Sequence, residues 1–527
     1  MRTPRRMSNE VLDTTDDAPR RPGGRRRAAR SARFRIGRRR GGARRAAREH
    51  RRAHGLPGTL GLTALGAFVP GSGYLYSGRK ALGVAVLGVW LAGVAALLWY
   101  FGRGIDATLD LAFDPTRTRI AAVLLGTVLL VWAFVVLTSH RLVRHRSRPR
   151  WHTAVGWTTS LVLVAVGAAP VLVAARYAMA TADTVENVLD ESPNSATIPE
   201  MATEDDPWAG EKRVNVLLLG GDGGKGRTGV RTDTVILASI DTETGRTVLF
   251  SLPRNMQGAE FPEDSPLHDV YPDGYRTGMG DDAYDMLNAI YGQVPQTHPG
   301  ILGDSDNEGA DAVKQAVEGS LGIPVDYYLL VNLAGFQDVV DALGGITVNV
   351  NEPVAINGDT DRGIPPTGYI EPGPEQHLDG FHALWFARGR YGSDDYARMD
   401  RQRCTIDAMI DAADPSTILT RYLDILQAGE EIVYTDIPRA LGKPFVKLLL
   451  KVKEGKVRSV VFRSSDQFSS ADPDFDYMQD VVQKSLYPKK REPGTPKPDR
   501  PTENPVDVCA YNPVDGVETD SDLSASD

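Results

Sequence analysis

The chain has 527 residues, a formal net charge of −8, 42% apolar residues and 7% aromatic residues. This length excludes one compact domain, and the composition allows a soluble core together with membrane segments. The organisation therefore has to be taken from local patterns.

Residues 1–54 form a basic tail with nineteen arginines and five acidic residues, whereas the chain as a whole is acidic. A nucleic-acid-binding tail would be expected to show interleaved aromatic residues or a helical pattern, and this tail has neither. Attraction to anionic inner-leaflet lipid is the simpler interpretation, because each basic residue near that surface gains about 1 kcal/mol. We therefore expect this lipid as a partner of a cytoplasmic tail, and no nucleic acid.

Three apolar runs follow, each with about the twenty residues that are needed to cross a hydrocarbon core. They contain no charge and cover residues 81–101, 120–139 and 155–175. A buried core helix is the alternative, but three such runs in succession favour three transmembrane helices. A shorter apolar stretch at 56–69 suits a re-entrant or interfacial segment, so residues 55–176 are predicted to form a membrane domain.

Basic residues flank these spans unevenly and predict the orientation of the chain. The loop HRLVRHRSRPRWH between the second and third spans is densely basic, whereas the loop after the first span is mixed. The tail and the basic loop are therefore expected inside the cell. Three crossings then place the residues after 176 outside, on a multi-pass cell-membrane protein.

Beyond the membrane domain the composition changes twice. Residues 177–210 are predicted to be an acidic linker, 211–486 a folded extracytoplasmic domain, and 487–527 a disordered Pro-rich tail. Strand and helix patterns alternate in the folded domain, which predicts an α/β layer sandwich with a mixed sheet. The predicted strands are 214–220, 234–240, 247–253, 325–331 and 346–350, and the predicted helices are 282–292, 309–322, 333–345, 377–388 and one that begins at Asp395.

Polar side chains gather where predicted strands begin or end, which is where a rigid sheet can direct several side chains towards one ligand. Asp222 follows the first strand, Arg231 and Asp233 precede the second, and Arg254 follows the third. The stretch GGDGGKGRT superficially suggests a phosphate-binding P-loop. Its spacing fails, because Leu219 stands where the first glycine is needed, so the glycines more simply allow a turn.

The segment 387–403 holds five arginines and three aspartates. On the helix that begins at Asp395, Arg398 and Gln402 share one face with Asp395, and Arg401 lies beside them. Arg388 and Arg390 approach from the preceding loop. Surface ion pairs on a solvated face are the alternative interpretation.

Together the arginines are an unusual excess for an acidic domain unless they meet a polyanion. Guanidinium groups bind phosphate with two parallel hydrogen bonds and stay charged at physiological pH. Asp222 and Asp233 supply the few oxygen ligands that Mg²⁺ uses when phosphate and water complete its shell. The pattern indicates phosphoryl transfer or pyrophosphate cleavage on a lipid-borne phosphate. The arginines concerned are Arg231, Arg254, Arg388, Arg390, Arg398 and Arg401.

Five motifs occur in an order that resembles the LytR-CpsA-Psr family of cell-wall glycopolymer ligases. They are VNVLLLGGD, RTDTVILASID, LFSLPRN, LDGFHALWFARGR and DDYARMDRQR, and the likeness covers residues 214–410 and continues more weakly to VRSVVFRSS. The resemblance implies an α/β/α domain that holds a polyprenyl chain in an apolar tunnel, with its pyrophosphate at an arginine-lined mouth. It also implies Mg²⁺-assisted transfer of a phosphoglycan from that lipid to a peptidoglycan sugar hydroxyl.

The resemblance assigns roles residue by residue. Asp222 and Asp233 match the metal-linked aspartates, and Asp395 is our candidate for the base that takes the hydroxyl proton, although it could instead hold Arg398 in place. The phosphate-binding arginines and the second cluster correspond to Arg231, Arg254, Arg388 and Arg390, and to Asp395, Arg398, Arg401 and Gln402.

Two departures from the family pattern stand out. Asn255 occupies a position where the family commonly has Asp, and it carries no charge, so it is expected to orient Arg254 rather than bind a metal. The three spans replace the single anchor often found in the family, and their role is open. A polyprenyl-pyrophosphate hydrolase and a non-enzymatic membrane regulator are the alternative functions.

The only two cysteines are Cys404 and Cys509. Both are predicted to lie outside the cell, where the compartment is oxidising and a disulfide can persist. Two free thiols, with Cys404 as a small buried residue, are the alternative. A bond between them would hold the C-terminal tail against the helix that bears Arg398.

Overall fold

The computed structural model describes residues 55–144, 149–195, 197–199, 202–203, 206–221, 231–358, 360, 363–413, 417, 421, 424–425, 428, 433–488 and 507–512. The chain divides into two compact units, Met1–Ala95 with Leu130–Gly167, and Ala96–Leu129 with Ala168–Asp527. The predicted basic tail and the predicted metal ligand Asp222 lie outside the described residues.

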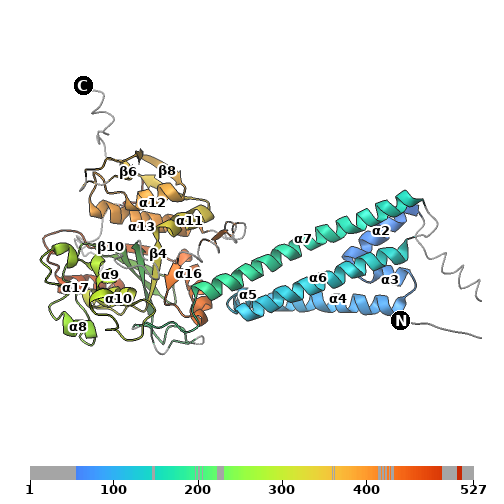
Figure 1. The fold of residues 1–527 in the computed structure, drawn as a ribbon, viewed down its shortest axis with the longest axis horizontal. Helices are drawn as coiled ribbons and strands as arrows, with labels where there is room; N and C mark the ends of the chain where they lie inside the picture. Colours follow the sequence, from blue (N-terminus) through green and yellow to red (C-terminus); the bar gives the residue numbers. More distant parts are fainter. Residues whose placement is uncertain are drawn as a thin grey trace, which may run out of the picture. The chain divides into compact units, whose positions relative to one another are not determined.

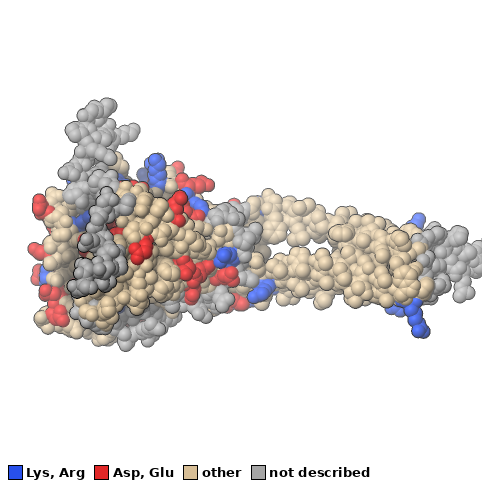
Figure 2. Space-filling view, turned by 90° about the horizontal axis from the view of Figure 1, so that it is seen from above, with Lys and Arg blue, Asp and Glu red and all other residues tan. Residues whose placement is uncertain are grey.

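Among the described residues, three helices are long and apolar enough to cross a membrane by length and composition. They are α4 Lys80–Phe101, α6 Pro115–Val143 and α7 Arg150–Val188, and each contains one of the predicted runs. On the face seen in Figure 2, these helices are almost free of charged side chains over most of their length. Helix α7 is longer than predicted and includes the first part of the expected linker, because residues 177–188 contain good helix formers and no glycine or proline.

The apolar stretch predicted as a re-entrant or interfacial segment forms helix α2 Gly55–Phe68, which is followed by α3 Ser72–Tyr76. Thr63 Oγ1 lies 2.9 Å from His140 Nδ1, and Trp132 Nε1 donates to the Ala67 carbonyl at 3.0 Å. These bonds hold α2 against α6, the second predicted span.

The folded domain that follows the membrane segments is built on a six-stranded mixed sheet in the order β10-β3-β2-β1-β4-β9 (Figure 1). Strand β1 pairs with β2 antiparallel and with β4 parallel, and β10 pairs with β3 in parallel. The strands are β1 Arg213–Gly221, β2 Thr232–Asp241, β3 Thr247–Ser251, β4 Tyr327–Asn332, β9 Val433–Thr435 and β10 Val457–Val461.

Both faces of the sheet are buried, as the alternation in β2 shows. Val235 and Leu237 face a core shared with helices α9, α10 and α17, whereas Ile236 and Ala238 face a core shared with α16. Side chains of a strand alternate between faces, so one apolar run serves two helical layers. The domain is therefore the predicted α/β/α sandwich. These helices are α9 Leu287–Thr297, α10 Glu308–Leu321, α16 Gly442–Glu454 and α17 Phe475–Leu486.

A further group of elements contributes one wall of the candidate site and has its own apolar core. The helices are α11 Leu333–Leu343, α12 Gly380–Arg388 and α13 Asp395–Ala412. Two small sheets accompany them, β5 Ile346–Val350 with β8 Gly373–Leu378, and β6 Val354–Ile356 with β7 Gly368–Ile370. The predicted strand 346–350 is thus β5, outside the main sheet.

Two predicted helices begin later than expected. The helix predicted from His377 starts at Gly380, because Asp379 accepts the backbone N–H of His382 at 2.9 Å and caps it. Glycine is required there, since a Cβ would lie 2.2 Å from the Gln337 carbonyl oxygen. The helix predicted at 282–292 is split into a 3₁₀ turn, Asp282–Tyr284, and α9, because Met286 pairs with Gln257 in a β-bridge. Further short elements are helices α5 Ile105–Ala112 and α8 Pro266–Val270 and a 3₁₀ turn, Arg439–Leu441.

The predicted acidic linker docks on the folded domain through Ser195, near the middle of the linker. Ser195 donates to Asp311 at 2.6 Å and to Asp436 at 3.1 Å. Asp436 also receives a bond from Lys314, and the side chains of both are almost completely buried. A buried ammonium is stable only when it is paired and hydrogen-bonded, so this segment is part of the fold.

One piece of the tail predicted to be disordered is ordered against the domain. Asn349 Nδ2 donates to the Cys509 carbonyl at 2.9 Å, and Asn351 Nδ2 donates to the Ala510 carbonyl at 3.0 Å. Cys404 and Cys509 are joined by a disulfide bond with their Cα atoms 5.4 Å apart. The expected pair is therefore bonded, and residues 507–512 pack on the small sheet that contains β5. The rest of that tail beyond Pro488 lies outside the described residues.

The disulfide should contribute strongly to stability, because it joins residues 105 positions apart. For a loop of this length the chain-entropy model gives about 4 to 5 kcal/mol. Reduction of the full chain in detergent should lower its melting temperature, and Cys509→Ser should have a low melting temperature that reductant does not change. Alkylation of both thiols in the native, unreduced protein would contradict the bond.

Candidate active site

A cavity of about 1440 Å³ lies between the main sheet and helices α11, α12 and α13. Much of its wall is apolar and comes from both layers. Aliphatic side chains of β2 and β4 face those of α11 and the C-terminal half of α13 across it. The apolar lining includes Ile236, Leu329, Val331, Phe336, Val339, Leu343, Leu384, Ile406, Met409, Ile410 and Leu449.

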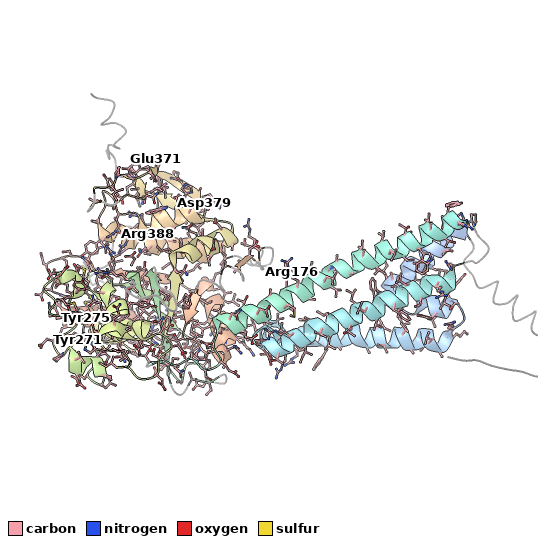
Figure 3. All side chains as sticks on the ribbon, viewed as in Figure 1. Arg176, Tyr271, Tyr275, Glu371, Asp379 and Arg388 are labelled. Carbon is pink, nitrogen blue, oxygen red and sulfur yellow. A yellow bond between two sulfur atoms is a disulfide. The ribbon has the colours of Figure 1, made fainter. Side chains whose placement is uncertain are left out.

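The other part of the lining is polar and holds five arginines and three aspartates. It gathers residues from the start of β2, the end of β3, the end of α12 and the start of α13. Figure 3 labels Arg388, at the end of α12. The residues are Arg231, Asp233, Arg254, Asn255, Arg388, Arg390, Asp394, Asp395, Arg398 and Gln402.

Arg254 connects the two walls of this polar part. Its Nη1 donates to Asp233 Oδ1 at 2.5 Å, and its Nε lies 3.6 Å from Asp395 Oδ1. The first contact follows from the sheet, because β2 and β3 are antiparallel and the start of one lies beside the end of the other. The second crosses to helix α13. One guanidinium group therefore joins a carboxylate on the sheet to a carboxylate on the helix.

Arg398 is the most deeply placed charge of the site, with a side chain only 3% exposed. From the next turn of α13 its Nη2 donates to Asp395 Oδ2 at 3.1 Å, and its Nη1 forms an ion pair with Asp395 Oδ1 at 3.0 Å. Burial lowers the pKa of Arg398 to about 10, which still leaves it charged at neutral pH. Its buried Nε has no hydrogen-bond partner among the described residues, and a ligand oxygen in the cavity would satisfy it.

Gln402 stands one further turn along the same face of α13. Its Nε2 donates to Thr234 Oγ1 on β2 at 2.8 Å, which ties the helix to the sheet below the arginines. Asp395, Arg398 and Gln402 therefore share one face of α13, as their spacing predicts, and that face lines the cavity.

Arg401 is the predicted phosphate ligand that the structure places elsewhere, since it does not line the cavity. Its Nε donates to the Phe386 carbonyl at 2.8 Å, its Nη2 donates to the Gly389 carbonyl, and its Nη1 binds Glu352 at 2.9 Å. These bonds direct the Arg401 guanidinium towards backbone carbonyls rather than into the cavity, and phosphate binding by Arg401 stays a prediction. Arg401 instead holds the chain that carries Arg388 and Arg390.

Sequence reasoning missed three contributors to the site. Asp394 caps α13 by accepting the Ala397 N–H at 2.7 Å, and an aspartate just before a helical pattern could have indicated this. Asn288 lines the cavity with a buried Oδ1 that has no partner among the described residues. Neither Asn288 nor Glu352 had a sequence signal, because each reaches the site through tertiary packing alone.

An α/β/α domain with an apolar cavity and an arginine-rich mouth defines a class of protein that binds an amphiphile with an anionic head. The LytR_cpsA_psr family matches residues 173–490 of this chain. The chain belongs to this family.

Curated relatives agree with this membership. One is polyisoprenyl-teichoic acid–peptidoglycan teichoic acid transferase TagU of Oceanobacillus iheyensis, which is 28% identical over 302 residues, covering 56% of this chain and 79% of the relative. The protein of the same name from Enterococcus faecalis is 31% identical over 257 residues, covering 47% of this chain and 71% of the relative.

Solved structures also align with the chain. Protein gbs0355 from Streptococcus agalactiae is 25% identical with a TM-score of 0.38, covering 54% of this chain and 90% of that protein. TagV of B. subtilis is 25% identical with a TM-score of 0.37, covering 52% of this chain and 97% of that protein.

Replacing Arg401 should damage the fold rather than only ligand binding. Arg401→Ala leaves two backbone carbonyls and Glu352 without this partner. We therefore expect the free energy of unfolding to fall by about 2 to 4 kcal/mol. Thermal unfolding of the full chain in detergent measures the effect. Arg403→Ala is the matched control on the same helix, because the only ion pair of Arg403 within the described part of the chain is a long contact of 4.0 Å with Asp407. Equal melting temperatures for Arg401→Ala and the wild type would contradict the positioning role.

Proposed function

We infer that this protein transfers a phosphoglycan from a polyprenyl-pyrophosphate carrier to a sugar hydroxyl of peptidoglycan, and so attaches a glycopolymer to the cell wall. Family membership and relatives named as polyisoprenyl-teichoic acid–peptidoglycan teichoic acid transferases support this activity. The polyprenyl-linked glycan and peptidoglycan are its substrates.

One observation carries the inference, namely that apolar and arginine-lined surfaces belong to a single cavity. A prenyl chain gains free energy when its hydrocarbon is removed from water. A pyrophosphate gains from several guanidinium groups that bind its oxygens with paired hydrogen bonds. The lipid carrier combines the two parts, because it has an apolar prenyl chain joined to an anionic pyrophosphate.

The arginines act on the charge that develops during transfer. The acceptor oxygen bonds to the phosphorus that carries the glycan, the bond from that phosphorus to the bridging oxygen breaks, and polyprenyl phosphate leaves. Arg254, Arg388 and Arg398 lie where they can neutralise the transferring group and the leaving phosphate. Fixed charges of this kind lower the barrier because they need no rearrangement as the reaction proceeds.

Asp395 receives the proton of the sugar hydroxyl in this proposal. Its Oδ1 lies within reach of both Arg254 and Arg398, and its Oδ2 accepts from Arg398. We propose that substrate phosphate takes over the contact with Arg254 and leaves this carboxylate oxygen for the hydroxyl. Until then Asp395 positions the two arginines.

We propose that the carboxylates of this site bind Mg²⁺. Among the described residues, no group of three His, Cys, Asp or Glu side chains could hold a metal by itself. Mg²⁺ commonly uses one or two carboxylates together with substrate phosphates and water, so Asp233 and Asp222 would suffice to hold it. The ion would supply further positive charge at the phosphate oxygens.

The localisation follows from the same reasoning. We propose that the catalytic domain is extracytoplasmic, because its acceptor is cell-wall material and the basic residues place the tail inside. The tail would bind anionic inner-leaflet lipid there. Peptidoglycan is then available to the domain.

Loss of a cavity arginine should abolish most of the turnover. Arg254→Ala and Arg388→Ala should each reduce the transfer rate roughly a hundredfold or more, because each removes a charge that stabilises the transition state. The full chain with lipid-linked glycan and peptidoglycan oligomers provides the assay, and Arg403→Ala is the control. Near-wild-type rates in both variants would contradict the phosphate site, and release of polyprenyl phosphate without an acceptor would indicate a hydrolase.

The metal proposal has its own test. Asp233→Asn should raise the Mg²⁺ concentration needed for half-maximal rate, since a neutral amide is a weaker ligand. Asp233 also binds Arg254, so Arg254→Ala is the comparison that loses this contact and keeps the carboxylate. The same Mg²⁺ dependence in Asp233→Asn and the wild type would remove Asp233 from the coordination shell.

A further inference from the structure

Helix α5 is a short connection between two predicted spans, α4 and α6. It belongs to the same compact unit as the extracytoplasmic domain. Asp106 and Asp110 stand one turn apart on it, as do Lys443 and Lys447 on helix α16. Lys443 Nζ binds Asp110 Oδ1, and Lys447 Nζ binds Asp106 Oδ1. The two helices therefore meet in antiparallel fashion, with matched opposite charges.

The start of α16 fits tightly against this part of the chain. A Cβ at Gly442 would lie 2.3 Å from Phe113 Cε1 and 3.1 Å from Leu189 Cδ1, so a larger residue would collide with both. Arg439 Nε also donates to the Leu189 carbonyl at 3.1 Å. Phe113 follows α5 and Leu189 follows α7, so residues at the ends of different predicted spans hold one end of α16.

The other end of α16 borders the cavity. Leu449 lines the cavity and is nevertheless 58% exposed, and the neighbouring Leu450 is 47% exposed. Lys453 Nζ donates to the carbonyl of Ala413, which also lines the cavity, at 2.7 Å. The cavity is thus open to its surroundings beside α16. This opening is apolar, whereas the other part of the cavity is rich in arginine.

The membrane fixes where this opening lies. A helix that joins two spans lies at the membrane surface, so α5 has to be there. Helix α16 is bound to α5 and therefore lies there too. Exposed leucines next to lysines are typical of a helix in the interface, where aliphatic side chains enter the lipid and ammonium groups stay among the headgroups.

We propose that α5 is a clamp that holds α16 on the outer surface of the bilayer, so that the prenyl chain of the carrier passes from the outer leaflet past Leu449 into the cavity. This proposal rests on the proposed function and gives the additional spans a role in it. Direct passage keeps the prenyl hydrocarbon out of water throughout, which avoids the free-energy cost of exposing each CH₂ group to water. Single exposed ion pairs contribute little to stability, so the clamp acts by orientation.

Charge reversal on α5 tests the clamp in the full chain reconstituted in liposomes. The variant Asp106→Lys with Asp110→Lys places like charges opposite Lys447 and Lys443. The probes are a disaccharide on a long polyprenyl pyrophosphate in the bilayer and the same disaccharide on a short, water-soluble prenyl pyrophosphate. We expect KM for the embedded probe to rise roughly tenfold or more, because the like charges repel each other and α16 loses its orientation at the bilayer, with little change for the soluble probe.

Two further variants separate orientation from damage. Adding Lys443→Asp and Lys447→Asp to the reversed α5 should restore use of the embedded probe. Asp183→Lys is the matched control, because Asp183 forms an exposed ion pair with Arg119 and none with α16. Unchanged kinetics with the embedded probe in the reversed variant, equal losses with both probes, or absence of rescue would each overturn the proposal.

A readout without catalysis distinguishes failure of the clamp from failure of the proposed function. An environment-sensitive fluorophore on Leu450→Cys should report a hydrocarbon surrounding in liposomes and a more polar one after reversal of α5. If neither prenyl probe is a substrate of the wild type, the proposed function fails. The fluorescence still shows whether α5 holds α16 at the bilayer. Equal polarity before and after reversal would show that α5 does not hold α16 at the bilayer.

Discussion

The candidate site depends on the contact of Arg254 with two carboxylates from different layers of the domain. Asp233 belongs to the sheet and Asp395 to helix α13, and Arg254 bridges them. A guanidinium group can leave bulk water only when its charge is compensated, so the two layers are linked through their most polar residues. The cavity between them can be apolar elsewhere because this contact and the Gln402 bond to Thr234 hold the two layers together at the polar part.

Helix α13 shows how much of this arrangement one helical period can specify. Asp395, Arg398 and Gln402 recur along the face towards the cavity, whereas Arg401 points to the backbone that carries Arg388 and Arg390. Cys404 lies one turn further and anchors residues 507–512. The same helix therefore carries cavity-lining polar groups, the support of a neighbouring loop and a covalent link, because its residues project in different directions.

The strands and most helices could be predicted because short apolar runs and helical apolar periods leave local signals, as in β2. The direction of Arg401 could not, since arginines at adjacent positions of one cluster look alike in sequence while only tertiary structure decides which is buried. The docking of Ser195 on Asp311 and Asp436 likewise had no local signal. The polar, proline-rich composition of 487–527 predicted disorder, whereas Asn349 and a disulfide hold residues 507–512 against the domain.

Asn255 modifies the balance of charge in the mouth of the cavity. That part of the lining has five arginines and three aspartates, so it has a positive excess towards an anionic ligand. An aspartate at 255, as the family commonly has, would reduce this excess and offer one more oxygen to a cation. Under the proposed function, Asn255 leaves more of the pyrophosphate charge to the arginines, and the burial of Arg398 makes its own contacts stronger than they would be in water.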